Sequence, residues 1–276
     1  MNHITFPYLG LDFHLNETVS IFGFKIYWYA IIIALGMLVA IALASFEFKK
    51  RGYTGDDLAD FVLFGIPLGI LGARLYYVIF DWSYYAENIG DIFAIWKGGL
   101  AIYGGVIAGC IVAIVYTRVK KIPFLWFADV ATRGLFIAQS IGRWGNFVNA
   151  EAFGSLTSLP WGMVVEGAGV KPYSPFGPCH PTFLYESLWN LTGFIISYFI
   201  IYRLLKTDGY AFAYYLIWYG AGRFMIEGLR TDSLWLIKDV VRVSQLVAFV
   251  SVIGGIAVLF YIENRKKKAK NIPDGK

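Results

Sequence analysis

The chain has 276 residues, of which 58% are hydrophobic and only 16% are charged, whereas an average soluble domain has about 25% charged residues. The apolar residues fall in long uninterrupted runs, so the composition excludes a soluble globular protein and indicates an integral membrane protein. The formal net charge of +5 does not indicate nucleic-acid binding, because the basic residues lack an interleaved aromatic face.

Residues 1–25 mix polar and apolar types and are expected to precede the first membrane span. They do not fit a signal peptide, since no basic start precedes a short apolar core. Apolar runs of about 20 residues, the length that a membrane-spanning helix needs, then follow one another. They cover 26–47, 58–80, 99–119, 123–142, 183–203, 209–229 and 240–262. We therefore expect an all-α integral membrane protein with seven transmembrane helices.

Basic residues predict the orientation of these helices, because cytoplasmic loops are enriched in lysine and arginine. One side would carry Lys49, Lys50, Arg51, Arg118, Lys120, Lys121, Arg203, Lys206, Arg265, Lys266, Lys267, Lys268, Lys270 and Lys276, and the other only Lys25, Lys97, Lys171, Lys238 and Arg242. We therefore expect an extracytoplasmic segment over 1–25, a membrane domain over 26–262 and a basic cytoplasmic tail over 263–276. The tail also fits a stop-transfer anchor that touches anionic lipid.

Glycines follow the second and third predicted helices, at Gly65, Gly69, Gly72, Gly105 and Gly109. Their default interpretation is close packing of the two helices. Two further pairs, Gly98-Gly99 and Gly104-Gly105, flank Tyr103 at the mouth of the third helix. Such glycines either let the backbone approach a ligand or permit a tight helix entry, and the spacing does not decide between these alternatives.

The most informative stretch runs from Gly142 to Glu151, where an apolar run ends in a cluster of charge and amides. An arginine such as Arg143 at the end of a membrane helix is costly to desolvate unless an anionic group meets it. Asn146 and Asn149 could donate to phosphate oxygens or fix the loop. We expect a lipid-headgroup site or a reaction centre here, at the start of a long extracytoplasmic loop over 143–182.

Four arginines would lie at one depth, near the outer edge of the membrane: Arg74, Arg143, Arg223 and Arg230. A shared anionic ligand would explain this, and a planar guanidinium suits bidentate binding of phosphate. Arg223, Glu227 and Arg230 share one helix face, since they are four and three residues apart. Arg133 lies deeper, and we expect it to pair with Asp129 one turn earlier.

The entry to the fifth helix holds Cys179, His180, Pro181 and Glu186. Pro181 and Glu186 suit ordinary capping of a helix start. His180 is either structural or part of the site. Cys179 beside it gives only a weak indication of a metal site, because no second pair of ligands accompanies it, and Cys179 and Cys110 should lie at different depths without a disulfide.

Taken together, these motifs make the chain resemble the prolipoprotein diacylglyceryl transferases over nearly its whole length. The signature Gly-Arg-x-Gly-Asn-Phe-x-Asn from Gly142 is highly specific. The other motifs lie at Trp28-Tyr29, Gly72-Ala73-Arg74-Leu75, 98–105, Asp129, 180–186 and 222–230. The resemblance implies transfer of the diacylglyceryl group of phosphatidylglycerol to the lipobox cysteine of a prolipoprotein signal peptide, with a thioether as product and glycerol phosphate as leaving group.

The resemblance also implies the site residues and the location. Catalytic roles are expected for Arg143, Arg223, Tyr103, Glu151 and His180, and substrate binding for Tyr29, Arg74, Arg143, Asn146, Asn149, Gly154, Glu227 and Arg230. The enzyme would work in the bacterial plasma (inner) membrane, among membrane lipids and without nucleic acid, with its active site toward the extracytoplasmic side. Two departures stand out: many relatives have a histidine in place of Tyr103, and they commonly have a proline in place of Arg133.

The expected chemistry is displacement at a saturated carbon by sulfur. A free thiol has a pKa of about 8.5, so the base need not be strong. The larger problem is the departing phosphate, whose charge Arg143 and Arg223 would stabilise, and neither a metal nor an organic cofactor is required. We expect Tyr103 to orient substrate while Glu151 or His180 removes the proton. Two rival classes stay open: a transporter or flippase for an anionic lipid or solute, and a non-enzymatic seven-helix receptor or scaffold.

Overall fold

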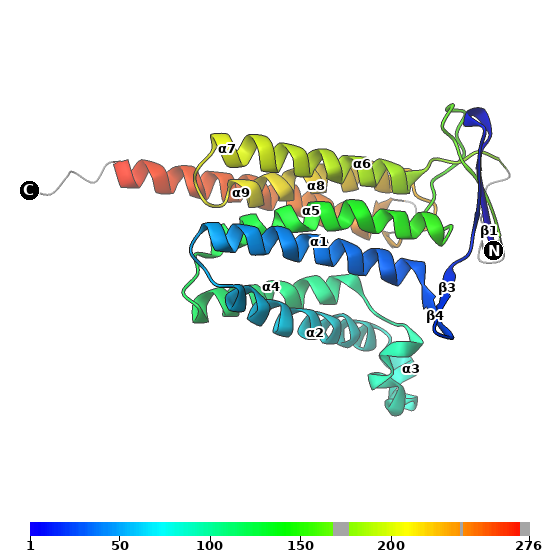
Figure 1. Ribbon diagram of the computed structural model, residues 1–276, viewed down its shortest axis with the longest axis horizontal. Coiled ribbons are helices and arrows are strands. Elements are labelled where there is room, and N and C mark those ends of the chain that lie inside the picture. The colour runs from blue at the N-terminus through cyan, green and yellow to red at the C-terminus, as the bar shows by residue number, and fades with distance from the viewer. Residues whose placement is uncertain (168–176, 238–239, 271–276) are drawn as a thin grey trace, which may run out of the picture. The chain divides into compact units, whose positions relative to one another are not determined.

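A computed structural model describes residues 1–167, 177–237 and 240–270 (Figure 1). Part of the loop predicted over 143–182, the end of the predicted tail, and the basic residues Lys171, Lys238 and Lys276 lie outside the described residues. The chain forms two compact units. The first comprises Met1–Leu43 with Ala128–Lys276, and the second comprises Ala44–Phe127.

Helical segments occupy every range predicted to be a membrane span. They are α1 (Trp28–Lys50), α2 (Gly55–Phe80), α4 (Ile102–Val119), α5 (Phe124–Val148), α6 (Thr182–Ile195) continued by a π-helical stretch (Ile196–Ile201) and α7 (Tyr202–Leu204), α8 (Tyr210–Glu227) and α9 (Val243–Lys270). Among the described residues, five helices are long and apolar enough to cross a membrane: α1, α2, α4, the Thr182–Leu204 segment and α9. The protein is therefore mostly helical and suited to a membrane.

The expectation of an all-α chain is wrong outside the helices, because residues 1–27 form strands. Strands β1 (Asn2–Phe6), β2 (Leu11–Leu15) and β5 (Val164–Gly167) make an antiparallel sheet in the order β2-β1-β5, and a 3-10 turn (Pro7–Leu9) joins the first two. Two hairpins follow, β3 (Thr18–Ile21) with β4 (Phe24–Tyr27) and β6 (Trp235–Ile237) with β7 (Val241–Arg242). Burial alternates along β1, a period of two that a search for long apolar runs does not detect.

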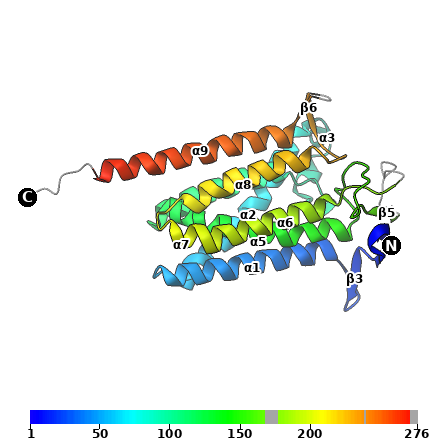
Figure 2. The same cartoon turned by 90° about the horizontal axis from the view of Figure 1, so that it is seen from above.

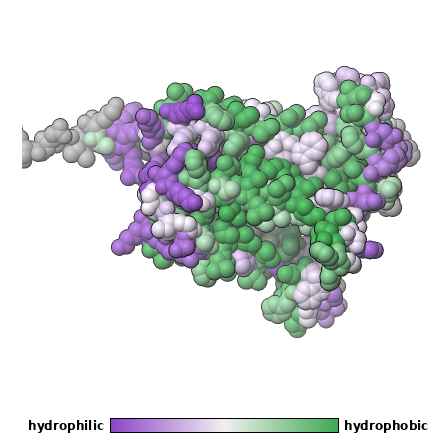
Figure 3. All heavy atoms as spheres, in the orientation of Figure 1, coloured by the Kyte–Doolittle hydropathy of each residue, from purple (hydrophilic) through white to green (hydrophobic). Residues whose placement is uncertain are grey.

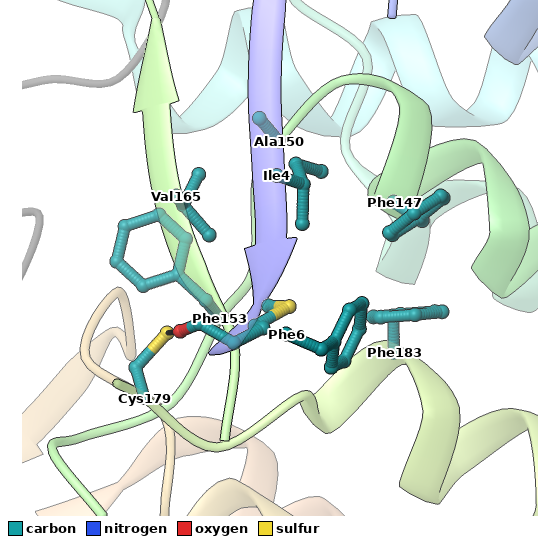
Figure 4. Packing of buried hydrophobic residues seen from close by; sticks show 9 residues of the cluster. Ile4, Phe6, Phe147, Ala150, Phe153, Val165, Cys179 and Phe183 are labelled. Carbon is teal, nitrogen blue, oxygen red and sulfur yellow. Dashed lines mark hydrogen bonds between the residues drawn. The ribbon is translucent and has the colours of Figure 1, made fainter. Parts of the chain in front are cut away.

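The sheet packs on the ends of two helices. Ile4 and Phe6 of β1 join Phe147 at the end of α5 and Phe183 at the start of α6 in one buried cluster (Figure 4). Cys179 belongs to the same cluster, with no exposed surface and its thiol donating to the Met163 carbonyl at 3.1 Å. Cys179 is therefore a core residue, and the structure adds nothing to the weak indication of a metal site beside His180.

Glycines and one buried carboxylate position the helices of the first unit. Helix α9 lies along α8 (Figure 2), where a Cβ on Gly220 would come within 2.7 Å of the Ala248 carbonyl oxygen. Both Asp129 oxygens accept backbone N–H groups at the start of α8, from Gly209 and Phe212 at 2.7 Å each. Asp129 therefore caps the start of α8. The sequence predicted only that Asp129 would pair with Arg133 on the same helix.

Surface polarity changes along α9. On the face shown in Figure 3, hydrophobic side chains cover much of the helical part, and hydrophilic ones lie near the C-terminal end of α9 and again at the opposite edge of the picture. The last turns of α9 contain Arg265, Lys266, Lys267 and Lys268. Such a change is typical of a helix that leaves the hydrocarbon for a charged interface.

The second unit contains α2 and α4 with α3 (Trp82–Glu87) and two 3-10 turns (Ile89–Phe93, Ile95–Lys97) between them. A Cβ on Gly72 would lie 2.8 Å from the Gly104 carbonyl oxygen, so the predicted close packing is confirmed at this position. Gly105 also approaches α2, at Gly69. Gly65 and Gly109 have no close neighbour on the partner helix among the described residues.

Candidate functional site

Glu186 is the centre of a cluster of arginines in the first unit. Its carboxylate contacts Nη2 of Arg143, Nη1 of Arg223 at 2.9 Å and Nη1 of Arg230 at 3.5 Å. These arginines come from α5, from α8 and from the turn after α8. The structure therefore brings together three of the four arginines predicted at one depth, around an acid for which only a capping role was predicted.

The arginines are more accessible than the acids that hold them. Exposed fractions of the side chains are 21% for Arg143, 17% for Arg223 and 12% for Arg230, against 4% for Glu186. Glu227 is 1% exposed and lies 2.6 Å from Nη2 of Arg223. Arg143 and Arg223 are therefore more accessible to an entering anion than Glu186 and Glu227 are.

Arg230 has a further acidic partner. Its Nε and Nη2 donate to the two Asp232 oxygens at 2.9 and 2.7 Å, which is a bidentate pair. Burial acts to raise the pKa of Asp232, but the hydrogen bonds from Arg230 outweigh it and the pKa lies below its usual value. Asp232 therefore stays ionised and holds Arg230 in place.

Helix α5 continues to Val148, so Arg143 and Asn146 lie on one helical face and not in the loop expected from residue 143. Nη1 of Arg143 donates to Asn146 Oδ1 at 3.2 Å, and Asn146 Nδ2 donates to Glu151 Oε1 at 2.9 Å. Asn149 Nδ2 reaches the same Glu151 oxygen at 3.5 Å. The signature residues thus form a hydrogen-bonded chain from Glu151 to the arginine cluster.

Gly154 closes the loop against two other segments. Its N–H donates to the His180 carbonyl at 2.9 Å, and the next residue, Ser155, donates to the Leu229 carbonyl at 2.8 Å. A Cβ on Gly154 would lie 2.7 Å from the His180 Cβ and 3.1 Å from the Leu229 carbonyl oxygen. Glycine is required here because the backbones come too close for a side chain, which explains this predicted site residue.

His180 forms part of an aromatic hydrogen-bonded group. Its Nδ1 lies 3.1 Å from the Tyr185 hydroxyl, which also accepts the Trp161 Nε1–H at 2.7 Å. Burial lowers the pKa of His180, so its imidazole is neutral near pH 7.

Tyr29 lies near the end of α5. Its ring packs on Gly145, where an added Cβ would lie 2.7 Å from Tyr29 Cδ2, and it is within electrostatic range of Arg143 and Glu151. The predicted residue Tyr29 therefore adjoins the signature segment.

Arg74 and Tyr103, two further predicted residues, lie in the second unit. Arg74 is buried and donates to the backbone carbonyls of Asp91, Ile92, Gly98 and Gly99 at 2.5–2.9 Å. Gly98 and Gly99 both have a positive φ, and their own carbonyls accept from the guanidinium. The glycine pair thus supplies hydrogen-bond acceptors to Arg74, which belongs to the same unit. Tyr103 lies at the start of α4, with its ring 6.4 Å from that of Tyr76.

The sequence alone missed Glu186 and Asp232 as site residues. Glu186 sits in the first turns of α6, where an acid is common for reasons of helix polarity, so its position carried no distinct signal.

Arg133 lies over the Tyr202 ring at 4.8 Å.

Comparisons with known proteins show which family the sequence resembles. Residues 16–261 match the family model described as prolipoprotein diacylglyceryl transferase. A Clostridioides difficile protein is 44% identical over 90% of this chain and 95% of its own length, and a Streptococcus uberis protein is 44% identical over 91% and 95%. A Streptococcus pyogenes protein is 46% identical over 88% of this chain and 92% of its own. All three relatives are named phosphatidylglycerol–prolipoprotein diacylglyceryl transferase.

Proposed function

The chain belongs to the prolipoprotein diacylglyceryl transferase family, and we propose that the Glu186-centred arginines carry out the central step of its reaction. The protein is a membrane transferase that moves the diacylglyceryl group of phosphatidylglycerol onto a prolipoprotein, the first step of lipoprotein maturation. The acceptor is the thiol of the lipobox cysteine. Sulfur forms a bond to the glycerol carbon of the diacylglyceryl group, the bond from that carbon to the phosphate oxygen breaks, and glycerol phosphate leaves with the electron pair.

One observation carries the assignment: partly exposed guanidiniums are held by buried carboxylates. The Arg143 and Arg223 side chains keep some exposed surface, while Glu186 and Glu227, which contact them, are almost fully buried. A planar guanidinium offers five N–H donors, so the contacts to the acids leave donors for phosphate oxygens. The arginines are therefore positioned before the lipid arrives.

The leaving group gains charge during this reaction. A phosphodiester carries one negative charge, and the released monoester carries about −1.5 to −2 at pH 7. Fixed cationic donors act most strongly on charge that develops in the transition state, and removal of one such donor typically costs a factor of about 10² to 10³ in rate. Arg143 and Arg223 are the residues we assign to this task, while Arg230, which Asp232 holds, also contacts Glu186.

Formation of the thiolate is the smaller problem. With a pKa of about 8.5, a thiol is ionised at pH 7 at a cost of roughly 2 kcal/mol. Direct transfer of the proton to an ordinary carboxylate, about four pKa units lower, costs roughly 6 kcal/mol. We therefore propose that the thiol proton passes through water to the solvent, and that Glu151 orients this water without taking up the proton itself.

His180 is better placed as a donor than as the base. The Trp161 indole can only donate, so the Tyr185 oxygen accepts that hydrogen bond and its own hydrogen is available for His180 Nδ1. In this tautomer the imidazole carries its hydrogen on Nε2. We assign His180 to orienting the substrate and Tyr29 to binding substrate near Arg143. We assign Tyr103 to hydrogen bonding with lipid or peptide.

The membrane arrangement is part of this proposal. All seven helical segments span the membrane, with the N-terminus outside and the basic tail over 263–276 in the cytoplasm. Residues 1–25 and the 143–182 region form the extracytoplasmic part, and 26–262 the catalytic domain. The uneven distribution of lysine and arginine supports this orientation. Lipid would then enter sideways from the outer leaflet of the bacterial plasma (inner) membrane.

A reconstitution experiment tests the function. Purified protein is incubated with phosphatidylglycerol vesicles and a lipobox peptide, the peptide is weighed by mass spectrometry, and the released phosphate compound is identified. Transfer predicts a diacylglyceryl mass gain on the cysteine, none on a peptide with serine in its place, and an equal amount of glycerol phosphate. Lipid movement without a covalent product would support a flippase, and no lipid response at all a receptor.

A further inference from the structure

The N-terminal sheet carries a cluster of side chains that the transfer reaction does not use. His3 lies directly opposite His14 on β2 and opposite Glu166 on β5, so these three residues form one row across the three strands. Asp12 lies two residues from His14 and therefore on the same face. The other face of β1 carries the buried Ile4 and Phe6, so the row points away from the core.

The donor atoms of this cluster converge on one point. His3 Nε2 lies 2.8 Å from Asp12 Oδ1, and His14 Nε2 lies 3.5 Å from the same oxygen. The two imidazole rings are stacked, with centroids 4.4 Å apart and planes 1° apart. One ligand atom from each of these residues lies within 4.8 Å of the others.

We propose that His3, Asp12 and His14 bind one divalent transition-metal ion of the Zn²⁺ type. Imidazole nitrogen with one carboxylate suits Zn²⁺, Cu²⁺ or Ni²⁺, whereas Ca²⁺ and Mg²⁺ prefer oxygen ligands alone. Ligands at 2.0–2.2 Å from a tetrahedral zinc ion are separated by about 3.3 Å. The His14–Asp12 distance already fits this value, and the His3–Asp12 distance must widen by roughly half an ångström.

Glu166 supports the assignment independently. Its Oε2 lies 3.3 Å from His3 Nδ1, the ring nitrogen that does not face Asp12. A metal-binding histidine usually donates its second N–H to a carboxylate, which fixes the tautomer and aims the other nitrogen at the metal. Glu166 on β5 has this position relative to His3.

The site would fasten the sheet. A metal held by β1 and β2, with Glu166 of β5 behind it, ties together the three strands whose opposite face packs on Phe147 and Phe183. Asp12 and His14 are exposed, so an ion can enter without movement of the core. The fourth coordination position is left for water or another ligand.

Metal titration tests the proposal. Full-length protein without a histidine tag is stripped with a chelator in detergent, titrated with Co²⁺ by visible absorption, and then titrated with competing Zn²⁺. We expect one ion per chain and displacement of Co²⁺ by Zn²⁺. His3→Gln and His14→Gln should each weaken binding at least as much as Glu166→Gln, for which the expected loss is about 10- to 100-fold.

His180→Gln is the matched control, since His180 is the remaining histidine of the chain and lies outside the cluster. It should bind the metal as tightly as the wild type. Zn²⁺ should also raise the unfolding temperature of the wild type and of His180→Gln but not of the His3→Gln/His14→Gln double variant. Absence of saturable binding by the wild type, or equal affinity of the wild type and the double variant, would overturn the proposal.

Discussion

Oε1 of Glu186 lies 2.9 Å from Nη1 of Arg223, although the two residues are 37 positions apart and belong to different helices. The same carboxylate holds Arg143 of a third helix. Helix polarity favours an acid near the start of α6, but it does not require that acid to be buried or to contact three arginines. We infer that Glu186 positions the arginines for an anionic substrate.

Glu186→Gln should therefore affect both stability and transfer. Loss of the charge leaves the positive charges of Arg143, Arg223 and Arg230 incompletely compensated. Removal of one partner of a buried ion pair typically lowers the free energy of unfolding by about 3–5 kcal/mol. We expect a clear fall in the unfolding temperature in detergent and a loss of transfer in the peptide assay. Asp232→Asn is the control, since its half-exposed carboxylate should contribute no more than about 1 kcal/mol. Equal effects of the two variants would remove Glu186 from its central place.

Arg143→Lys should impair transfer far more than Arg133→Lys, with both proteins still inserted in the membrane. A lysine cannot contact Glu186 and Asn146 at once as the Arg143 guanidinium does. The expected loss in rate is about 100- to 1000-fold for Arg143→Lys. Arg133, which is on the same helix as Arg143, lies over Tyr202 and is more deeply buried than Arg143, is the comparison. Similar mild effects of both changes would place Arg143 outside the reaction centre.

Replacement of Tyr103 separates orientation from proton transfer. We expect Tyr103→Phe to reduce transfer without abolishing it, because the ring remains and only a hydrogen bond is lost. Tyr103→His should be active, since many members of the family have histidine here. The measurement is the transfer rate against pH for both variants. If phenylalanine abolishes turnover and histidine restores it with a titration near neutral pH, Tyr103 carries the proton after all.

The lowered pKa of His180 predicts a pH-dependent term in stability. Burial disfavours the imidazolium, so the unfolded chain takes up a proton near its usual pKa of 6.5 while the folded chain does so only at lower pH. Stability is therefore fully present above about pH 6.5 and decreases as the pH falls toward the folded pKa.

His180→Gln should remove this term. Between pH 7.5 and 5, the unfolding free energy of the wild type should fall more than that of the variant, as measured by denaturant titration in detergent. The pKa of His3 is raised because its ring donates hydrogen bonds to Asp12 and Glu166, so His3 acts in the opposite direction, but it is common to both proteins. Parallel curves for the two proteins would contradict the burial of a neutral His180.

Much of the helical framework could be predicted because it depends on local properties. Apolar runs gave the approximate positions of all seven helical segments, and the small residue Gly72 marked a true helix contact. The end of α5 was placed too early, since Arg143 and Asn146 look like loop residues, although a helix that leaves the membrane tolerates them. Arg143, Asn146 and Glu151 were nevertheless correctly grouped, as they are close in the chain.

Long-range pairing could not be predicted. Strand β1 pairs with β5, so that His3 meets Glu166 at a separation of 163 residues, and neither strand has a strong pattern alone. Glu186 had a sufficient local explanation as a helix-start acid, and its arginine partners lie 37 to 44 residues away. Arg74 was grouped with the other arginines by depth, yet its hydrogen bonds go to the backbone around Gly98.

The most direct measurement of the central claim is the steady-state kinetics of Arg223→Lys with phosphatidylglycerol and a lipobox peptide. An interaction that strengthens only as the leaving phosphate gains charge contributes to kcat and not to substrate affinity. We predict that kcat falls by about 100- to 1000-fold while KM for the lipid changes little. An unchanged kcat with only a raised KM, or no change in either, would contradict stabilisation of the leaving group by the Glu186-centred arginines.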